Sequence, residues 1–271
     1  MSLRSMLVAI TSAIAVFSGL SVQGQVTLLT QERNVWTRTT SRNQEPFVPP
    51  GGASDTDTLV ASDFGAFTPA IVSSVAPDAF AHASQNSLLL STGLTASGTA
   101  DASVVGRRHV EISSQSQSFI RVGFEVAGPM RYKLVGGATL DRWDGPYSLS
   151  RIRMYVDGLY DGSIGFPLVE DLAVDQRGNL TPGTYEYYVS TELSVTNIEY
   201  AVAGADVASF DFALTFHCPA DFNVDGSVGS QDFFDFLTAF LAADPSADYT
   251  ADSAISSEDF FAFLGYFFSP C

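Results

Sequence analysis

One pattern occurs twice in the C-terminal part of this chain, at a fixed offset of 27 residues. Residues 221–232, DFNVDGSVGSQD, run into the apolar stretch FFDFLTAF, and residues 248–259, DYTADSAISSED, run into FFAFLGYF. A match at constant spacing indicates a duplicated supersecondary unit. Each unit places oxygen-bearing side chains at alternate loop positions and then apolar residues at helical spacing. The pattern predicts a loop followed by an amphipathic helix, repeated once.

The first loop has the ligand order of a twelve-residue calcium loop, which uses positions 1, 3, 5, 7, 9 and 12. Those positions hold Asp221, Asn223, Asp225, the carbonyl of Ser227, Gly229 through a water, and Asp232. Gly226 stands at position 6, where the chain must turn sharply with a positive φ. We therefore predict a calcium site in this loop.

The second loop follows the same order with two departures. Its ligand positions hold Asp248, Thr250, Asp252, the carbonyl of Ala254, Ser256 and Asp259. Position 6 is Ser253, and a serine in a left-handed turn costs about 1 kcal/mol relative to glycine. Position 3 is a threonine in place of an acid or amide. We therefore predict two unequal calcium sites, the second weaker, whose occupation is coupled to folding.

Apolar residues follow each loop at helical spacing. They are Phe233, Phe234, Leu237, Phe240 and Leu241 after the first loop, and Phe260, Phe261, Leu264, Phe267 and Phe268 after the second. Because two short helices have little else to bury, these stripes are predicted to form a core. Ser256, three residues before Asp259, is a predicted N-cap of the second helix.

The loop-then-helix order, the aspartate at position 12 and the tandem duplication resemble the dockerin module over residues 219–269. The flanking Cys-Pro-Ala-Asp-Phe-Asn and the terminal Pro-Cys are similar to GC-type dockerin-anchored secreted bacterial proteins. The resemblance implies a partner with a cohesin-like domain on a scaffold or cell surface, often in polysaccharide-degrading assemblies. It also implies that loop positions 10 and 11 face this partner. Those positions hold Ser230, Gln231, Ser257 and Glu258.

Residues 1–24 have the features of a secretory leader. Arg4 gives a positive n-region, Met6 to Leu20 is an apolar h-region, and small residues precede a cut at Gln25. The alternative is a retained anchor, which needs about 20 apolar residues and is weakened here by serines and a glycine. We expect export and cleavage, with no membrane span in the mature protein.

The only two cysteines, Cys218 and Cys271, bracket the duplicated unit. In the oxidising compartment that a leader implies, a disulfide between them is the default expectation. It would clasp the ends of the module. The alternative is that Cys271 bonds to a cell-wall component or to another chain.

The charge balance narrows the possible partners. The net charge is −17, from 13 basic and 30 acidic residues, and Lys133 is the single lysine. A basic patch for nucleic acid or anionic lipid is therefore not expected. Calcium or a cationic protein surface fits this charge better.

The preceding residues, 25–217, are dominated by strand-like alternation. It is clearest at 120–126, 151–156 and 210–216, where apolar and polar residues alternate. Weaker runs occur at 26–37, 86–96, 101–112, 131–140, 164–174 and 184–196. The stretch from Asn43 to Asp57 is expected to be a long loop.

Turn residues separate these runs. They occur at Gly128-Pro129, Gly136-Gly137, Asp144–Pro146, Asp157-Gly158, Asp161-Gly162, Arg177–Asn179 and Thr181–Gly183. Many short strands at such spacing predict an antiparallel β-sandwich of jelly-roll or immunoglobulin-like type. A parallel sheet would need helical crossovers, and the sequence offers no suitable segments.

Acidic residues in the body, residues 25–217, are compatible with an alternative function as a hydrolase. Two carboxylates about 5–9 Å apart on neighbouring strands form a glycosidase pair. The acids considered are Glu111, Glu125, Asp141, Asp144, Asp157, Asp161, Glu170, Asp171 and Asp175. Any antiparallel sheet with a polar face offers such pairs, so we assign no catalytic residue.

Aromatic residues of the body are compatible with a second alternative function, sugar binding. The set comprises Trp143, Tyr147, Tyr155, Tyr160 and Tyr187 or Tyr188. The hairpin at residues 154–163 resembles the Tyr-Val-Asp-Gly hairpin of lectin-like and carbohydrate-binding jelly rolls. The alternative is packing in the core or at an interface, because Asp-Gly also favours hairpin turns in general.

Taken together, the sequence predicts a secreted, non-enzymatic protein with a β-sandwich at 25–217 and a calcium-dependent docking module at 218–271. The alternative is a polysaccharide-active hydrolase or a carbohydrate-binding component of a polysaccharide-degrading assembly.

Overall fold

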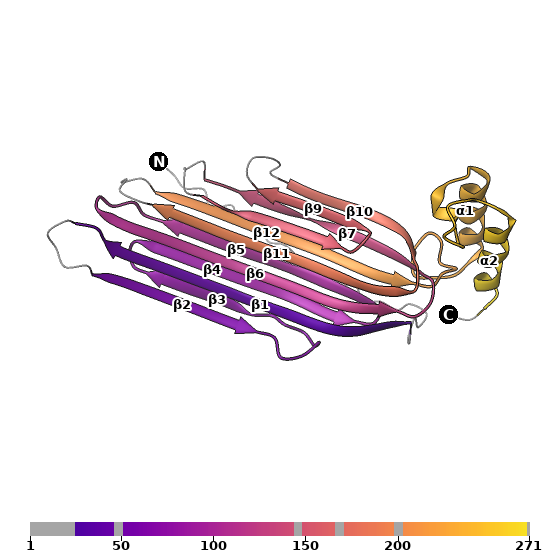
Figure 1. The fold of residues 1–271 in the computed structure, drawn as a ribbon, viewed down its shortest axis with the longest axis horizontal. Helices are drawn as coiled ribbons and strands as arrows, with labels where there is room; N and C mark the ends of the chain where they lie inside the picture. Colours follow the sequence, from indigo (N-terminus) through magenta and orange to yellow (C-terminus); the bar gives the residue numbers. More distant parts are fainter. Residues whose placement is uncertain (1–24, 46–50, 144–147, 166–170, 198–202, 270–271) are drawn as a thin grey trace.

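The computed structural model describes residues 25–45, 51–143, 148–165, 171–197 and 203–269. An elongated β body is built from two six-stranded sheets, and two short helices lie at one end of it (Figure 1). The predicted leader, residues 1–24, lies outside the described residues. Within the described residues, no helix is both long and apolar enough to cross a bilayer.

The first sheet has the strand order β2-β1-β6-β11-β8-β9. Its strands are β1 (Val26–Asn43), β2 (Gly52–Val60), β6 (Val110–Val126), β8 (Arg151–Val156), β9 (Tyr160–Gly165) and β11 (Gly183–Asn197). The second sheet has the order β10-β7-β12-β5-β4-β3. Its strands are β3 (Ala70–Val75), β4 (Ala79–Leu90), β5 (Gly93–Val104), β7 (Met130–Asp141), β10 (Asp171–Leu180) and β12 (Gly204–His217).

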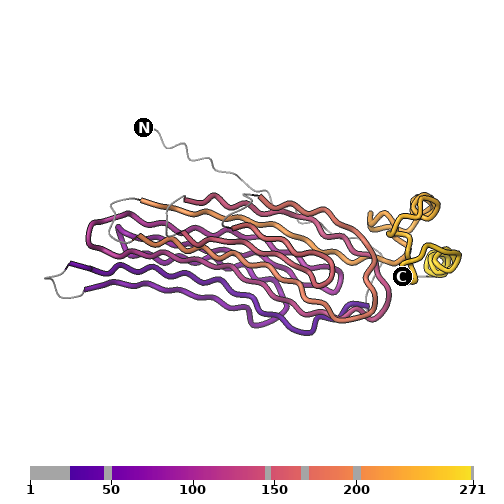
Figure 2. The backbone as a smooth tube through the Cα atoms, turned by 45° about the horizontal axis from the view of Figure 1, so that its top comes forward, coloured from indigo at the N-terminus to yellow at the C-terminus, as the bar shows by residue number. Residues whose placement is uncertain are grey.

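All strand pairs between these elements are antiparallel, which confirms the predicted mainly β, antiparallel body. The long strands of both sheets run along the length of the body (Figure 2). Tight connections such as Leu90 to Gly93 join sequence neighbours as hairpins. Pairs such as β1 with β6 and β6 with β11 instead join strands that are far apart in the sequence.

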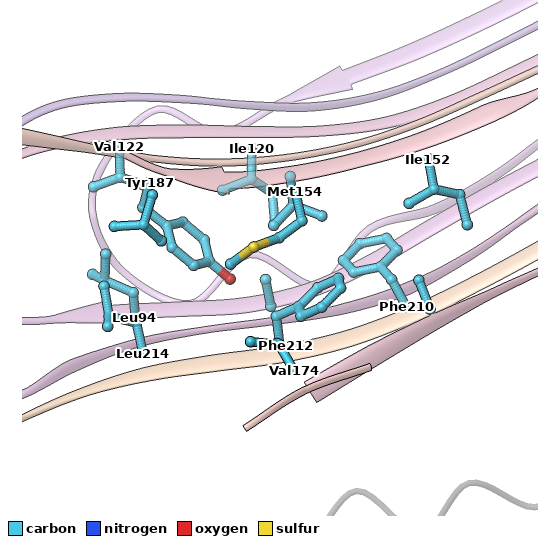
Figure 3. Close-up of a cluster of buried hydrophobic side chains, with 14 of the residues drawn as sticks. Leu94, Ile120, Val122, Ile152, Met154, Val174, Tyr187, Phe210, Phe212 and Leu214 are labelled. Atoms are coloured by element: carbon cyan, nitrogen blue, oxygen red, sulfur yellow. The ribbon is translucent and has the colours of Figure 1, made fainter. Parts of the chain in front are cut away.

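One apolar core lies between the two sheets (Figure 3). Strand β6 buries every second residue, so Ile120, Val122 and Phe124 point inward from the first sheet. They meet residues such as Phe212 of β12 from the second sheet. Period-two alternation thus places one face of the central strands in the shared core.

Four predicted boundaries are wrong. The run at 164–174 contains the end of β9 and the start of β10, with residues between them that lie outside the described ones. The run at 86–96 is a hairpin, because it contains the end of β4, a turn and the start of β5. The run at 101–112 contains the end of β5 and the start of β6. Strand β2 occupies part of the predicted loop at 43–57 and pairs with β1. Every residue of this edge strand is exposed, so polar residues such as Asp55 and Asp57 occupy it and no apolar alternation marks it in the sequence.

Gly136-Gly137 is not a turn but part of β7. Gly136 has a φ of 147°, and a Cβ there would lie 2.1 Å from the carbonyl oxygen of Asp211 on β12. Glycine is therefore required by the close approach of a neighbouring strand. The predicted turns at Asp161-Gly162 and Arg177–Asn179 are likewise internal to strands, β9 and β10.

The core of the body contains a tyrosine hydroxyl without a hydrogen-bond partner among the described residues, that of Tyr187. Burial raises the pKa of this phenol far above its ordinary value. Tyr187→Phe is expected to stabilise the chain by about 1 kcal/mol, because it removes an unsatisfied buried donor. Urea unfolding measures the change. Tyr185→Phe is the matched control, since Tyr185 donates to the carbonyl of Thr181 and its loss should not stabilise.

The C-terminal segment, residues 218–269, contains α1 (Ser230–Leu241), the short 3-10 helix η1 (Pro245–Ala247) and α2 (Ser257–Phe267). It has a small core of its own. The rings of Phe236 and Phe263 are fully buried and stack with their centroids 4.0 Å apart. Phe222, from the loop before α1, packs edge-on against both.

Candidate metal centre

The loop at 221–232 folds around its aspartates. Asp221 accepts hydrogen bonds from the backbone N–H groups of Asp225 and Gly226, at 3.0 and 2.9 Å. Asp232 accepts from the N–H groups of Asn223 and Gly229, at 3.1 and 2.8 Å. The first and last acids of the loop thus hold its two ends together.

The loop at 248–259 has the same hydrogen bonds at an offset of 27 residues. Asp248 accepts from the N–H groups of Asp252 and Ser253. Asp259 accepts from those of Thr250 and Ser256, at 3.0 and 2.8 Å. The duplication seen in the sequence is therefore also a duplication of local structure.

Both loops turn through the left-handed region at position 6, as predicted. Gly226 has a φ of 91°, and Ser253 has a φ of 68°. Position 4 is left-handed too, at Val224 and Ala251. Ser253 therefore carries a backbone strain that Gly226 avoids.

The end of each loop is also the start of a helix. The hydroxyl of Ser256 accepts from the N–H of Glu258, and Asp259 reaches back to the N–H of Ser256. The predicted N-cap is confirmed. In the first repeat Gly229 replaces the serine, and only the bond to Asp232 remains.

The acids of the two loops differ in their electrostatic surroundings. Burial raises the pKa of Asp232, and the charges of Asp221 and Asp225 raise it further, against hydrogen bonds from backbone N–H groups. Burial also raises the pKa of Asp259, but its hydrogen bonds from Ser256, Thr250 and Tyr249 outweigh this, so the pKa lies below its usual range. Repulsion by neighbouring carboxylates therefore raises the pKa of Asp232, at the end of the first loop, but not that of Asp259.

Asp225 is the exposed acid of the first loop. Hydrogen bonds from the hydroxyl and the N–H of Ser227 lower its pKa. Asp252 holds the equivalent place in the second loop and accepts from the N–H of Ala254. Both position-5 acids are exposed, so each side chain can turn toward a cation.

The donor set of each loop fits a hard cation. It consists only of carboxylate, amide, hydroxyl and carbonyl oxygens, which calcium prefers. Within the described residues, no three His, Cys, Asp or Glu side chains already converge on one point as a metal site. The acids instead hold backbone N–H groups. Carboxylate oxygens of Asp221, Asp232 and Asp248 that accept a single hydrogen bond keep a lone pair for a metal.

The predicted partner-facing residues lie at the start of the helices. Ser230 and Gln231 begin α1, Ser257 and Glu258 begin α2, and all four are exposed. Gln231 donates to Asp235 one turn further along the helix.

The predicted apolar stripes are wrong in part. Four of their members are exposed: Phe234 (59%), Leu241 (81%), Phe261 (67%) and Phe268 (79%). The buried residues are Phe236 and Phe263, which the stripes omitted. The helices are apolar on nearly every side, so sequence periodicity alone did not determine which face packs inward.

These exposed residues occupy equivalent positions in the two repeats. Phe234 and Leu241 on α1 correspond to Phe261 on α2 and to Phe268, the C-cap of α2, at the offset of 27 residues. Each pair is seven residues apart and so lies on one face of its helix. Each helix thus presents the same kind of apolar face to solvent.

Cys218 is buried and disulfide-bonded. Its predicted partner, Cys271, lies outside the described residues. The pairing itself stays a prediction.

The aromatic set of the body is packed rather than exposed. Trp143 is half-buried against the core and lies on Gly204, where a Cβ would be 2.4 Å from the indole. Tyr187 is fully buried, and Tyr160 is half-buried against the core. The rings of Tyr155 and Tyr188 stack on each other at 4.7 Å. Tyr147 lies outside the described residues.

An arginine side chain lies against the ring of each of the two stacked tyrosines. Arg153 lies 5.0 Å from the ring centre of Tyr155, and Arg121 lies 5.7 Å from that of Tyr188. Ring faces are what a sugar would stack on. Here they are engaged within the sheet, which favours the packing alternative.

The acids considered for catalysis are spread over both sheets. Glu125 lies on β6 of the first sheet, and Asp141, Asp171 and Asp175 lie on β7 and β10 of the second. Asp161 pairs with Arg153 at 3.2 Å. Asp144 and Glu170 lie outside the described residues. The described members are exposed except Glu111, which is half-buried.

No family model matches this sequence, and a search of curated proteins finds no match either. What the chain does is therefore argued from its own residues.

Proposed function

We propose that this chain is a secreted protein whose β body is displayed through a calcium-dependent, dockerin-type docking module at residues 218–271. The observation that carries the proposal is the duplicated loop, in which Asp221 and Asp232 hold the same backbone N–H groups as Asp248 and Asp259. Capped helices alone would explain one acid per loop. They do not explain acids at positions 1, 5 and 12 of both.

In this proposal calcium is held by side-chain and carbonyl oxygens of the two loops. The first set is Asp221, Asn223, Asp225, Ser227 and Asp232, and the second is Asp248, Thr250, Asp252, Ala254 and Asp259. Bound calcium supplies the positive charge that the loop acids otherwise lack, since residues 218–271 contain no lysine or arginine. The first loop is the tighter site because it has an amide at position 3 and a glycine at position 6.

Ser253→Gly is expected to tighten the second calcium site about fivefold. The change relieves about 1 kcal/mol of left-handed strain, and 1.4 kcal/mol corresponds to a factor of ten. Calcium calorimetry on the full chain gives the affinity. Gly226→Ser is the reciprocal control and should weaken the first site by a similar factor. Equal affinities before and after both changes would contradict the strain argument.

The docking surface in this proposal combines polar and apolar parts. Ser230, Gln231, Ser257 and Glu258 supply the polar positions at the helix starts. The exposed side chains of Phe234 and Phe261, with Leu241 and Phe268 beyond them, supply apolar area. Exposed phenylalanines on a small folded segment are unusual unless a partner covers them. An acidic segment calls for a partner with an apolar patch and a basic rim, such as a cohesin-like domain on a scaffold or cell surface.

The β body is, in this proposal, a β-sandwich that the module displays outside the cell. The leader at 1–24 and the disulfide at Cys218 support an exported protein. No residue of the body is assigned a catalytic role.

Docking is tested by capturing partners with the full chain from the secretome or envelope of the source cells, with calcium and with chelator. We expect a partner that is retained only with calcium. The double variant Phe234→Ala, Phe261→Ala is expected to weaken it by about 30-fold or more, the cost of losing a central anchor. Phe80→Ala is the matched control, since Phe80 is an exposed phenylalanine of the body. A partner captured equally with chelator would refute calcium-dependent docking.

A further inference from the structure

Three neighbouring residues at one end of the second sheet contact the C-terminal segment. Asn179 on β10 pairs with Arg131 on β7, and Arg131 pairs with His217 on β12. They form one row across three adjacent strands. Directly opposed residues of antiparallel strands lie close together and share a face. His217 is the last residue of β12, and this strand ends at the end of the body from which the helices project (Figure 1).

Arg131 is the central member of the row and is 1% exposed. Its guanidinium donates to the carbonyl oxygen of Phe222 at 2.8 Å and to that of Ser246 at 3.1 Å. It also lies 4.3 Å from the ring centre of Phe222. Phe222 precedes α1 and Ser246 precedes the second loop, so one side chain holds both repeats.

The outer members of the row extend these contacts. Asn179 donates to the carbonyl oxygen of Asp248 at 2.9 Å and accepts from Arg131 at 2.8 Å. The imidazole of His217 lies 2.9 Å from a carboxylate oxygen of Asp221. The row therefore reaches the first residue of both loops, Asp221 and Asp248.

Burying a guanidinium is costly unless its donors are satisfied. The two terminal nitrogens of Arg131 donate three hydrogen bonds to oxygens, two of them to the C-terminal segment, and its buried Nε has no partner among the described residues. If the segment detached, the guanidinium would lose these two bonds and the ring of Phe222. Detachment of the segment therefore exchanges contacts made by the sheet, as well as contacts within the segment, for contacts with water.

The connection between the two parts has no flexible spacer. Strand β12 ends at His217, and Cys218, Pro219, Ala220 and Asp221 are buried. Tyr249, at position 2 of the second loop, donates to the carbonyl oxygen of Pro219 at 2.7 Å. The chain passes directly from the sheet into the loops, and both loops are tied to that passage.

We propose that Asn179, Arg131 and His217 form a clamp that joins the β body and the C-terminal segment into one cooperative folding unit. The clamp holds the loops against the sheet, and Phe234 of α1 and Phe261 of α2 stay exposed. Any ligand that stabilises the loops then also stabilises the sheets. The identity of that ligand as calcium rests on the proposed function above.

Arg131→Met tests the clamp in the full chain, because methionine keeps much of the volume and none of the donors. In chelator, calorimetry of the wild type is expected to show a single unfolding transition. The variant is expected to show two, with faster hydrogen exchange across 218–269 at temperatures where the sheets stay protected. Arg151→Met is the matched control, since Arg151 is exposed and pairs with Glu192 on the first sheet. It should keep one transition.

Asn179→Ala provides a second variant if Arg131→Met does not fold. It removes the bond to Asp248 and should raise exchange in the second loop. Two separate transitions in the wild type, or unchanged exchange at 218–269 in both variants, would overturn the clamp. Adding calcium is a separate arm: it should raise the single transition of the wild type. A transition that does not move with calcium would refute the calcium proposal and leave the clamp standing.

Discussion

Phe236→Ala is expected to lower the free energy of unfolding of the full chain by about 3–5 kcal/mol. The ring of Phe236 is fully buried and stacks on that of Phe263, with Phe222 and Tyr249 edge-on around it. The core of the C-terminal segment contains four fully or nearly buried apolar residues, so the cavity has little around it that can collapse. Denaturant unfolding in chelator measures the loss.

The matched control for this prediction is two residues away on the same helix. Phe234→Ala removes an equal side chain that is 59% exposed, and it should change stability by no more than about 0.5 kcal/mol. Equal losses for the two variants would show that the helix packs through a different face. The core described above, with Phe236 as the buried residue of α1, would then be incorrect.

Asp232→Asn is expected to weaken the first calcium site by about 10- to 100-fold. The carboxylate accepts from the N–H groups of Asn223 and Gly229, and an amide nitrogen in place of one oxygen would face a donor. Each hydrogen bond to a charged group is worth about 1.5–3 kcal/mol, and 1.4 kcal/mol is a factor of ten. Calcium calorimetry on the full chain measures the affinity.

Two further aspartates serve as controls for Asp232. Asp235→Asn changes an acid on α1 outside the loop, and it should leave both affinities close to those of the wild type. Asp259→Asn removes the equivalent group of the second loop and should abolish only the weaker heat. If Asp235→Asn weakened binding as much as Asp232→Asn, overall charge rather than the loop would account for affinity.

Local features of the site were predictable because neighbouring residues determine them. The left-handed turn at Gly226 follows from the loop spacing, and so does that at Ser253, although serine disfavours it. The capping by Ser256 and Asp259 follows from their separation of three residues. Such interactions span a few residues and are readable from a single sequence.

The buried face of the helices was not predictable in the same way. Phe233, Phe234 and Phe236 are all apolar. Their spacing alone does not show which of them packs inward. The choice is made by tertiary partners: Phe263 and Phe222 meet Phe236 and leave Phe234 in solvent. Where a helix is apolar on several sides, periodicity ceases to identify the core.

The clamp shows a second limit of sequence reasoning. Arg131 is separated from Phe222 by 91 residues and from Ser246 by 115. On β7 it occurs near Lys133, and nothing local marks it as buried. Only the strand order, which places β10, β7 and β12 side by side, brings it to the loops. The sheet topology determines this contact, and a pattern of turns and alternation does not.

The central claim is that residues 221–232 and 248–259 form two unequal calcium sites, and calcium calorimetry on the disulfide-intact full chain tests it most directly. We predict two binding events of different affinity, with the tighter one weakened in Asp232→Asn and the weaker one lost in Asp259→Asn. Absence of any calcium-dependent heat, or two sites of equal affinity, would contradict the account.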